Sequence, residues 1–365
     1  MSANADAATS VPSQDGVRGL PEAPPLLSVR DLHVHFPRKG SGWFKPAEIV
    51  RAVDGVSLDV GKGRTLALVG ESGSGKTTTA LAVMRLAPIT SGHVRLGDTD
   101  LGALEGDALR EARKRLQIIF QDPFSSLNPR QRAGDAVRSP LELMRVGTPA
   151  SREERTAELF AAVGLRPEQQ RLFPHQFSGG QRQRINIARA LATNPELVVC
   201  DEPVSALDVA IRAQILNLLV RLQRELGLTY LFISHDMAVV EHICDDIAVM
   251  YLGQIVERAP RRAFFSNPLH PYAVALMSAV PTVHGGRARA ARRIRLSGDP
   301  PSPLAPPPGC RFAGRCPVAI PACSEAVPPL LEVSPGHAVR CIRVEVVAGR
   351  PHPPLELPTL GRASP

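Results

Sequence analysis

The stretch Gly70-Glu-Ser-Gly-Ser-Gly-Lys-Thr77 constrains this chain more than any other, because it fits the pattern G-x-x-x-x-G-K-[ST] and follows the apolar run Leu66 to Val69. A buried parallel strand that ends in a Gly-rich turn and leads into a helix directs successive backbone N–H groups at one point. The natural ligand of such a turn is a polyphosphate. Lys76 is placed to reach the β and γ phosphates, and the Thr77 hydroxyl can ligate Mg²⁺. A chance Gly-rich turn is disfavoured by the strand that precedes it.

The composition is that of a globular chain with no membrane-spanning or secretory segment. No run approaches about 18 apolar residues, and the N-terminus has neither a basic start nor an apolar core. We therefore expect a cytosolic protein that works at a membrane only by docking on other chains. The net charge of +8 could indicate nucleic acid or anionic lipid, but aromatic residues make up only 4% and no basic-aromatic platform is visible. No nucleic-acid partner is expected, and the Arg-rich run 287–295 is interpreted as a solvated linker rather than a lipid contact.

Composition also divides the chain into parts. Residues 1–26 are small and polar and are predicted to be a disordered lead-in. Strand-like apolar runs alternate with helical patterns over 27–258, which predicts an α/β domain with a mainly parallel sheet. Within it, about 123–176 is helical and polar and is predicted to be an inserted helical subdomain. Residues 259–345 are rich in Pro, Arg and Cys and predict a separate, loop-rich module, and 346–365 are predicted to be a flexible tail.

A second motif narrows the chemistry. The apolar run from Leu197 delivers two adjacent carboxylates, Asp201 and Glu202, at its C-terminal end, where ligands bind in α/β sheets. We expect Asp201 to hold Mg²⁺ and Glu202 to polarise the water that attacks the γ phosphate. An acidic pair between a strand and a loop is common in isolation, but downstream of a phosphate loop it favours hydrolysis.

A third motif predicts another anion-binding surface. Phe177-Ser-Gly-Gly-Gln181 leads into a helical pattern, so Ser178 is a natural N-cap and the two glycines leave backbone N–H groups exposed at the helix N-terminus. An ordinary Ser-Gly-Gly linker is a poor explanation for five such residues followed by Arg-Gln-Arg.

These motifs together resemble the ATP-binding cassette (ABC) family over about 27–258. The resemblance implies an ABC-type nucleotide-binding fold with an antiparallel β portion. It also implies a sandwich dimer, in which the phosphate loop of one subunit and the signature motif of the other hold the same ATP. Here the signature motif is Ser178 to Gln181, with Phe177 where Leu is commoner.

The resemblance assigns further residues. Gln121 looks like the glutamine that senses Mg²⁺, Asp208 like the end of the loop that crosses the dimer interface, and His235 like the switch histidine on the γ phosphate. Phe36 is the candidate for stacking on adenine, with core packing as its rival. The expected catalytic residues are thus Glu202, His235, Lys76 and Gln121, and the expected Mg²⁺ ligands Thr77, Gln121 and Asp201. The nucleotide-binding set is Phe36, Gly70, Glu71, Ser72, Gly73, Ser74, Gly75, Lys76, Thr77, Thr78, Ser178, Gly179, Gly180, Gln181 and Asp208.

The segments 120–130 and 267–272 and the Cys-Pro-rich end resemble the peptide and nickel importer branch, the dipeptide and oligopeptide permease ATPases. This implies an ATP-hydrolysing subunit at the cytoplasmic face of the membrane. Its partners would be a second ATPase, in a heterodimer or a homodimer, two membrane permeases, and an extracytoplasmic solute-binding protein. The alternatives are a soluble ABC ATPase acting on nucleic acid and a regulatory nucleotide-binding module.

The six cysteines fall into two groups. Cys200 and Cys244 lie in strand and helix patterns and are expected to be buried small hydrophobes. The other four lie in a segment too poor in apolar residues to build much core, where a metal centre would supply stability. Their spacing selects neither zinc nor iron–sulfur, whereas the resemblance implies a [4Fe–4S] cluster, with zinc or free thiols as alternatives. These four are Cys310, Cys316, Cys323 and Cys341.

Overall fold

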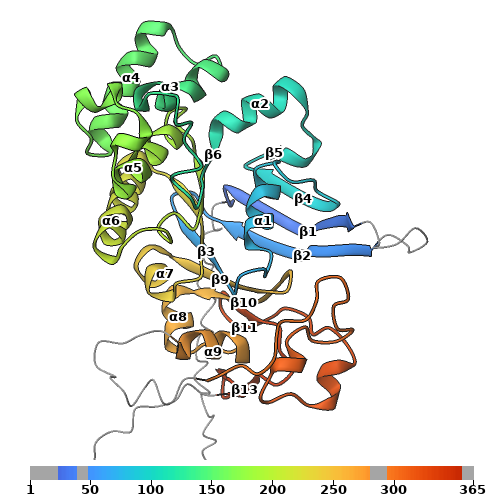
Figure 1. The fold of residues 1–365 in the computed structure, drawn as a ribbon. Coiled ribbons are helices and arrows are strands. Elements are labelled where there is room, and N and C mark those ends of the chain that lie inside the picture. The colour runs from blue at the N-terminus through green and yellow to red at the C-terminus, as the bar shows by residue number, and fades with distance from the viewer. Residues whose placement is uncertain (1–23, 39–47, 280–293, 356–365) are drawn as a thin grey trace, which may run out of the picture.

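The computed structural model describes residues 24–38, 48–279 and 294–355, which form a large mixed sheet, a smaller antiparallel sheet and a two-stranded ribbon (Figure 1). The strands are β1 (Leu27–Arg38), β2 (Glu48–Val60), β3 (Thr65–Val69), β4 (Ser91–Leu96), β5 (Thr99–Asp100), β6 (Leu116–Ile119), β7 (Leu197–Asp201), β8 (Thr229–Ser234), β9 (Asp246–Tyr251), β10 (Gln254–Pro260), β11 (Leu331–Ser334), β12 (His337–Val339), β13 (Glu345–Val347) and β14 (Arg350–His352). The helices are α1 (Lys76–Val83), α2 (Gly106–Arg115), α3 (Ala133–Leu143), α4 (Pro149–Ala162), α5 (Gly179–Ala190), α6 (Val209–Leu226), α7 (Met237–Ile243), α8 (Arg261–Ser266) and α9 (Pro271–Ser278). Within the described ranges, none of the helices combines the length and apolar character that crossing a bilayer requires.

The large sheet has the strand order β11-β12-β10-β9-β3-β8-β7-β6. The strands from β9 to β6 pair in parallel, and β10, β12 and β11 add an antiparallel edge. Every residue of β3, β7 and β8 is buried, which explains their continuous apolar runs. This confirms the predicted α/β fold. Because β3, β6, β7 and β8 are parallel neighbours, the loops at their C-terminal ends meet at one edge.

The smaller sheet, in the order β2-β1-β4-β5, is the antiparallel portion that the resemblance implied. Its inner face packs on α1 and on one face of the large sheet, in a core that includes Val34, Leu58 and Leu68. Alternation along β1 places Val34 in this core and its neighbours His33 and His35 on the other face.

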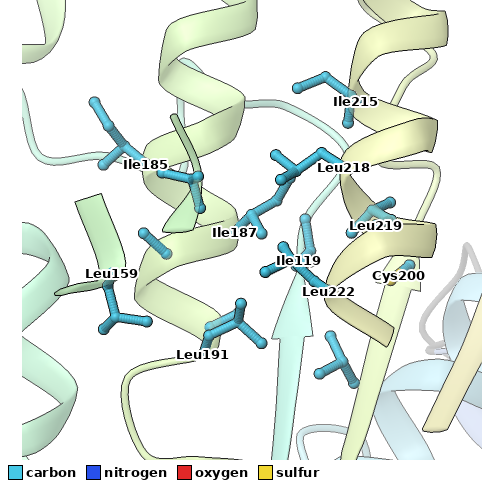
Figure 2. Close-up of a cluster of buried hydrophobic side chains, with 14 of the residues drawn as sticks. Ile119, Leu159, Ile185, Ile187, Leu191, Cys200, Ile215, Leu218, Leu219 and Leu222 are labelled. Atoms are coloured by element: carbon cyan, nitrogen blue, oxygen red, sulfur yellow. The ribbon is translucent and has the colours of Figure 1, made fainter. Parts of the chain in front are cut away.

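The helices α3 and α4 pack with α5 at one end of the large sheet, in the region predicted to be an inserted subdomain (Figure 1). Figure 2 shows how side chains from α4, α5, α6, β6 and β7 converge in one apolar cluster. Leu159, Ile187 and Leu219 in this cluster are each at most 1% exposed. The helical region is therefore continuous with the core beneath the loops that follow β6 and β7.

The C-terminal region shares the sheet and core of the cassette. The strand β12 pairs with β10, and Phe312 packs edge-on against Tyr251 of β9, with ring centroids 5.2 Å apart. The region is rich in loops, but it does not stand apart, because Phe312 and Leu296 pack in the same apolar cluster as side chains of the cassette. The pairing of β13 with β14 falls at 345–352, at the start of the segment predicted to be a flexible tail.

A buried carboxylate also ties this region to the sheet. Glu257 of β10 is fully buried, and it accepts hydrogen bonds from the backbone N–H groups of Leu269 (2.9 Å) and His270 (2.7 Å). His337 of β12 places Nε2 2.8 Å from the same carboxylate. The predicted lead-in up to residue 23, most of the Arg-rich run and the last ten residues lie outside the described ranges.

Candidate functional site

The phosphate loop runs from the end of β3 to the start of α1, and its glycines are required by geometry. Gly70 and Gly75 have φ values of +155° and +105°. A Cβ at Gly70 would lie 2.2 Å from the Met250 carbonyl oxygen, and one at Gly75 would lie 2.3 Å from the Ala52 carbonyl oxygen. Any side chain at either position would collide with backbone, so only glycine lets the loop lie this close to β2 and β9.

Lys76 occupies the centre of this loop. Its ammonium group donates hydrogen bonds to the carbonyl oxygens of Gly70 and Glu71, each over 2.8 Å, and its side chain is buried. Burial lowers the pKa of Lys76, while the nearby carboxylates of Glu202 and Asp201 oppose this effect. A negatively charged phosphate in the loop would favour the charged ammonium in the same way.

The oxygen atoms of Thr77 and Asp201 lie side by side. Thr77 Oγ1 donates to Asp201 Oδ1 over 3.1 Å, which joins the start of α1 to the end of β7. Burial raises the pKa of Asp201, so the ionised carboxylate is held at a cost that a bound cation would offset. A hydroxyl next to a carboxylate is the oxygen donor set that suits Mg²⁺.

Three side chains that sequence analysis placed in catalytic roles meet at one carboxylate. Gln121, after β6, donates from Nε2 to Glu202 Oε2 over 3.0 Å. His235, after β8, places Nδ1 3.0 Å from Glu202 Oε1. Glu202 itself has a positive φ of +47°, a conformation that side chains rarely adopt, so the turn after β7 aims it away from the path of the strand.

A cavity of about 630 Å³ lies over this arrangement. The residues predicted from sequence that line it are Gly70, Glu71, Ser72, Gly73, Gly75, Lys76, Thr77, Thr78, Gln121, Glu202 and His235. Further lining residues that sequence analysis missed are Val50, Arg51, Ala52, Leu252, Gly253, Leu276 and Pro303. They come from β2, the β9–β10 turn and the C-terminal region, and no local motif marks them.

Some predicted residues lie elsewhere. Phe36 is not among the described residues that line the cavity, and it packs against the core under the antiparallel sheet, as its rival interpretation held. Val50, which pairs with Phe36 across β1 and β2, lines the cavity in its place. Ser74 is buried beneath the loop, and Asp201 lines a neighbouring cavity and reaches the site through Thr77.

The predicted signature motif is built as a helix start. Ser178 caps α5: its Oγ accepts from the Gln181 N–H over 3.3 Å, and Gln181 Oε1 accepts from the Ser178 N–H over 3.0 Å. Asp208 caps α6 by accepting from the Ile211 N–H over 3.0 Å. Neither Asp208 nor the motif from Ser178 to Gln181 is among the described residues that line the cavity over the phosphate loop. The two motifs that are expected to bind phosphate therefore do not share this cavity within one copy of the chain.

The C-terminal region reaches the phosphate loop itself. Arg315 donates from its two terminal nitrogens to Glu71 Oε2 (2.8 Å) and Oε1 (3.3 Å), and the Glu71 N–H donates to the Tyr272 hydroxyl over 2.7 Å. Arg311 donates to the Leu252 carbonyl and to the Asp54 carboxylate. Two-point pairing of a guanidinium with a carboxylate fixes orientation as well as distance. Arg315 of the C-terminal region thus orients Glu71 in the loop that is expected to bind phosphate.

We expect Arg315→Ala to weaken ATP binding about 10-fold, because the loss of a charged hydrogen bond of about 1.5–3 kcal/mol leaves the Glu71 carboxylate half-buried and unpaired. Titration of ATP against the full chain measures this. Arg343→Ala is the matched control, since Arg343 makes its bond to the Val318 carbonyl within the C-terminal region. In a double-mutant cycle, Glu71→Gln should remove most of the effect of Arg315→Ala. Equal affinities in wild type and Arg315→Ala would show that the pair does not position the loop.

Comparisons with known proteins agree with this geometry. Residues 53–205 match the family model described as ABC transporter, and residues 256–323 match the one described as oligopeptide/dipeptide transporter, C-terminal region. Among solved structures, the dimeric ATP-binding cassette MJ0796, in a post-hydrolysis state with ADP and Pi, is 29% identical with a TM-score of 0.57. The match covers 65% of this chain and 99% of that one. The protein is thus an ATPase of the ABC class, which couples ATP hydrolysis to transport.

Similar proteins indicate which family within the ABC class the chain belongs to. The oligopeptide transport ATP-binding protein AppF of Bacillus subtilis is 47% identical over 87% of this chain and 96% of its own length. The dipeptide transport ATP-binding protein DppF of Escherichia coli is 46% identical over 88% and 95%, and a probable peptide ABC transporter ATP-binding protein, y4tS of Sinorhizobium fredii, is 50% identical over 87% and 89%. The chain belongs to the ATP-binding proteins of the oligopeptide/dipeptide ABC transporter family.

Proposed function

We propose that this chain hydrolyses ATP to drive the uptake of dipeptides or oligopeptides through separate membrane permeases. The observation that carries the proposal is that the region matching the oligopeptide/dipeptide transporter model, 256–323, contacts the loop that is expected to bind ATP. Arg315 of that region holds Glu71 of the phosphate loop. The region specific to this family is therefore in direct contact with the loop on which hydrolysis would depend.

The geometry supports a hydrolytic role for Glu202. Its two oxygens are held by Gln121 and His235, yet each carboxylate oxygen can accept more than one hydrogen bond. Glu202 would accept a proton from a water whose oxygen bonds to the γ phosphorus, while the bond from that phosphorus to the β-phosphate oxygen breaks and ADP leaves. Mg²⁺, held by Thr77 and Asp201 with Gln121 nearby, would neutralise charge on the phosphates. Lys76 would turn from the loop carbonyls to the β and γ phosphates.

The separation of the two anion surfaces supports a composite site between two subunits. Ser178 and the N–H groups at the start of α5 do not line the cavity over their own phosphate loop. A second cassette would bring its own signature motif to that cavity, and the solved MJ0796 cassettes, at 29% identity, are dimeric. We propose a second ABC ATPase as the partner, in a heterodimer or a homodimer.

A permease surface is proposed beside Gln121. A cavity of about 650 Å³ opens there between the loop after β6 and α3, lined in part by Gln121, Ser125 and Pro140. Phe124 in this loop is 58% exposed, and Leu143 at the end of α3 is 73% exposed. Exposed apolar side chains near a cavity of mixed polar and apolar lining suit a docking helix from a membrane protein. This would place the chain peripherally at the cytoplasmic face of the membrane, in contact with two permeases. An extracytoplasmic solute-binding protein would deliver the solute to these permeases.

The four C-terminal cysteines are proposed to hold a metal centre. All four line one small cavity behind Phe312, and burial raises the pKa of the Cys341 thiol to about 11 and that of Cys310 above its usual value. Among the described residues, no three of these sulfurs lie within 4.8 Å of one another, whereas four thiolates around one zinc ion at 2.3 Å would be about 3.8 Å apart. The choice of a [4Fe–4S] cluster over zinc rests on the resemblance of this segment to related importer ATPases. Anaerobic purification with iron and zinc analysis tests it: folded protein without metal would mean free thiols.

Purification in mild detergent through a tag on this chain tests the proposed function. We expect two permeases and a second ATPase to be retained, and ATP turnover by the complex to rise when a peptide-loaded solute-binding protein is added. Turnover that rises with DNA or RNA, in a preparation without permeases, would favour a nucleic-acid-linked ATPase instead. ATP binding without any turnover would favour a regulatory module.

A further inference from the structure

Two histidines and an aspartate form a compact group on the outer face of the antiparallel sheet. His33 and His35 lie two residues apart on β1 and so share a face, and Asp54 lies opposite His33 on β2. Asp54 Oδ1 is 2.9 Å from His33 Nδ1 and 3.1 Å from His35 Nε2. One nitrogen from each ring and one carboxylate oxygen thus lie within 4.8 Å of one another.

As a neutral ring, His33 cannot donate a hydrogen bond to both of its carboxylate neighbours. Its Nδ1 faces Asp54, and its Nε2 faces Asp31 Oδ1 at 3.2 Å. A neutral imidazole has one N–H and donates to only one of these carboxylates, whereas a protonated imidazolium donates to both. A cation at Nδ1 resolves the conflict, because Nε2–H then donates to Asp31 while Nδ1 is a ligand. Metal-binding histidines characteristically donate their other ring N–H to a carboxylate or carbonyl.

Asp54 is also oriented by a hydrogen-bond partner of its own. Asp54 accepts a hydrogen bond at Oδ2 from Arg311, which leaves Oδ1 facing the two imidazoles. The side chains of His33, His35 and Asp54 are 24%, 23% and 13% exposed, so the group is reachable from solvent but held on several sides. The ligand atoms are positioned by partners of their own and need little rearrangement.

We propose that His33, His35 and Asp54 bind a divalent transition-metal ion of the zinc type, with water as a fourth ligand. Two imidazole nitrogens and one carboxylate oxygen are borderline ligands that suit zinc and similar ions, whereas Mg²⁺ and Ca²⁺ select oxygen. Tetrahedral ligands about 2.0–2.1 Å from zinc lie about 3.3 Å apart. The nitrogens therefore have to move only a few tenths of an ångström from Asp54.

The position of this site connects it to the nucleotide cavity. Arg51, which pairs with His35 across β1 and β2, lines that cavity, and the Asp54 N–H donates to the carbonyl of Gly253, another lining residue, over 2.9 Å. A bound ion would hold β1 to β2 next to residues that line the cavity. The site is separate from the four C-terminal cysteines, although Arg311 follows the first of them.

Cobalt titration of the chelator-stripped full chain tests the proposal, because Co²⁺ spectra distinguish nitrogen and oxygen ligands from thiolates. We expect one equivalent of Co²⁺ to bind without a sulfur charge-transfer band, in addition to the Co²⁺ that binds with such a band when the four C-terminal cysteines are empty and reduced. His35→Gln and His33→Gln should each weaken this equivalent at least about 10-fold, as loss of one ligand removes one of three protein donors. His93→Gln is the matched control: His93 pairs with Asp100 on the same sheet at 3.1 Å, faces no second carboxylate in the described contacts, and should leave binding unchanged.

Thermal unfolding gives a second readout that does not depend on the variants folding well. Zn²⁺ at 100 times its dissociation constant should stabilise the stripped wild type by about 2.7 kcal/mol through binding to the folded state. A Co²⁺ spectrum with only thiolate features in the wild type, or equal Co²⁺ affinity in wild type and His35→Gln, would overturn the proposal. In that case the three side chains form a hydrogen-bonded group without a metal.

Discussion

Glu202→Gln is expected to lower ATP turnover by about 10²–10⁴-fold, the usual contribution of a general base. The amide keeps the size of the side chain but cannot take a proton from water. ATP binding should survive, because the phosphate loop and Lys76 are untouched. With hydrolysis blocked, closed ATP-bound dimers should accumulate, and size-exclusion chromatography in ATP measures them alongside phosphate release.

The control for this change is Glu225→Gln. Glu225 lies on α6 and pairs with Arg221 of the same helix, on the surface. Surface pairs of this kind contribute little, so turnover should match the wild type. Full turnover in Glu202→Gln would contradict the assignment of the base and would point to another proton acceptor at the cavity.

Gly75→Ala is expected to abolish measurable ATP binding, with a loss of at least about 100-fold. The added methyl group would lie 2.3 Å from the Ala52 carbonyl oxygen, at a φ of +105°. The loop must then move and lose backbone N–H bonds to phosphate, each worth about 1.5–3 kcal/mol. Isothermal titration with ATP measures the loss.

Gly63→Ala separates the steric effect from the backbone effect. Gly63 also has a positive φ, +71°, but nothing lies within 4 Å of the position that its Cβ would take. We expect a loss of about 1 kcal/mol in the free energy of unfolding and unchanged ATP affinity. Wild-type ATP affinity in Gly75→Ala would mean that the loop tolerates a side chain that this structure forbids.

The parts of the site that could be predicted from sequence are those in which local chemistry fixes position. A Gly-rich turn between a buried strand and a helix directs backbone N–H groups at one point, and carboxylates at the end of a parallel strand lie at the ligand-binding edge of the sheet. Three of the four expected catalytic residues follow parallel strands of the large sheet: Gln121 follows β6, Glu202 follows β7 and His235 follows β8. The fourth, Lys76, ends the Gly-rich loop at the start of α1. Their convergence on one cavity follows from the strand order.

Contacts between distant segments could not be predicted. Arg315 and Glu71 are 244 residues apart, and no periodicity in either segment indicates the other. The C-terminal region was predicted to be separate because it is rich in Pro and poor in apolar residues. In the structure it joins the sheet through β12 and buries Phe312 against the cassette, and both contacts are with segments distant in the sequence. Phe36 shows the limit of a resemblance, which made it the candidate for adenine stacking with core packing as the rival: the side chain packs, partly buried, against the core.

The central claim, that ATP hydrolysis at this site powers peptide uptake, is tested most directly by transport. The complex purified through this chain would be placed in proteoliposomes, with ATP on the side of the ATPases and labelled peptides with their binding protein on the other. We predict peptide accumulation that requires ATP and falls sharply when this chain carries Glu202→Gln. Peptide movement at the same rate without ATP, or no accumulation of dipeptides or oligopeptides by a complex that hydrolyses ATP, would contradict it.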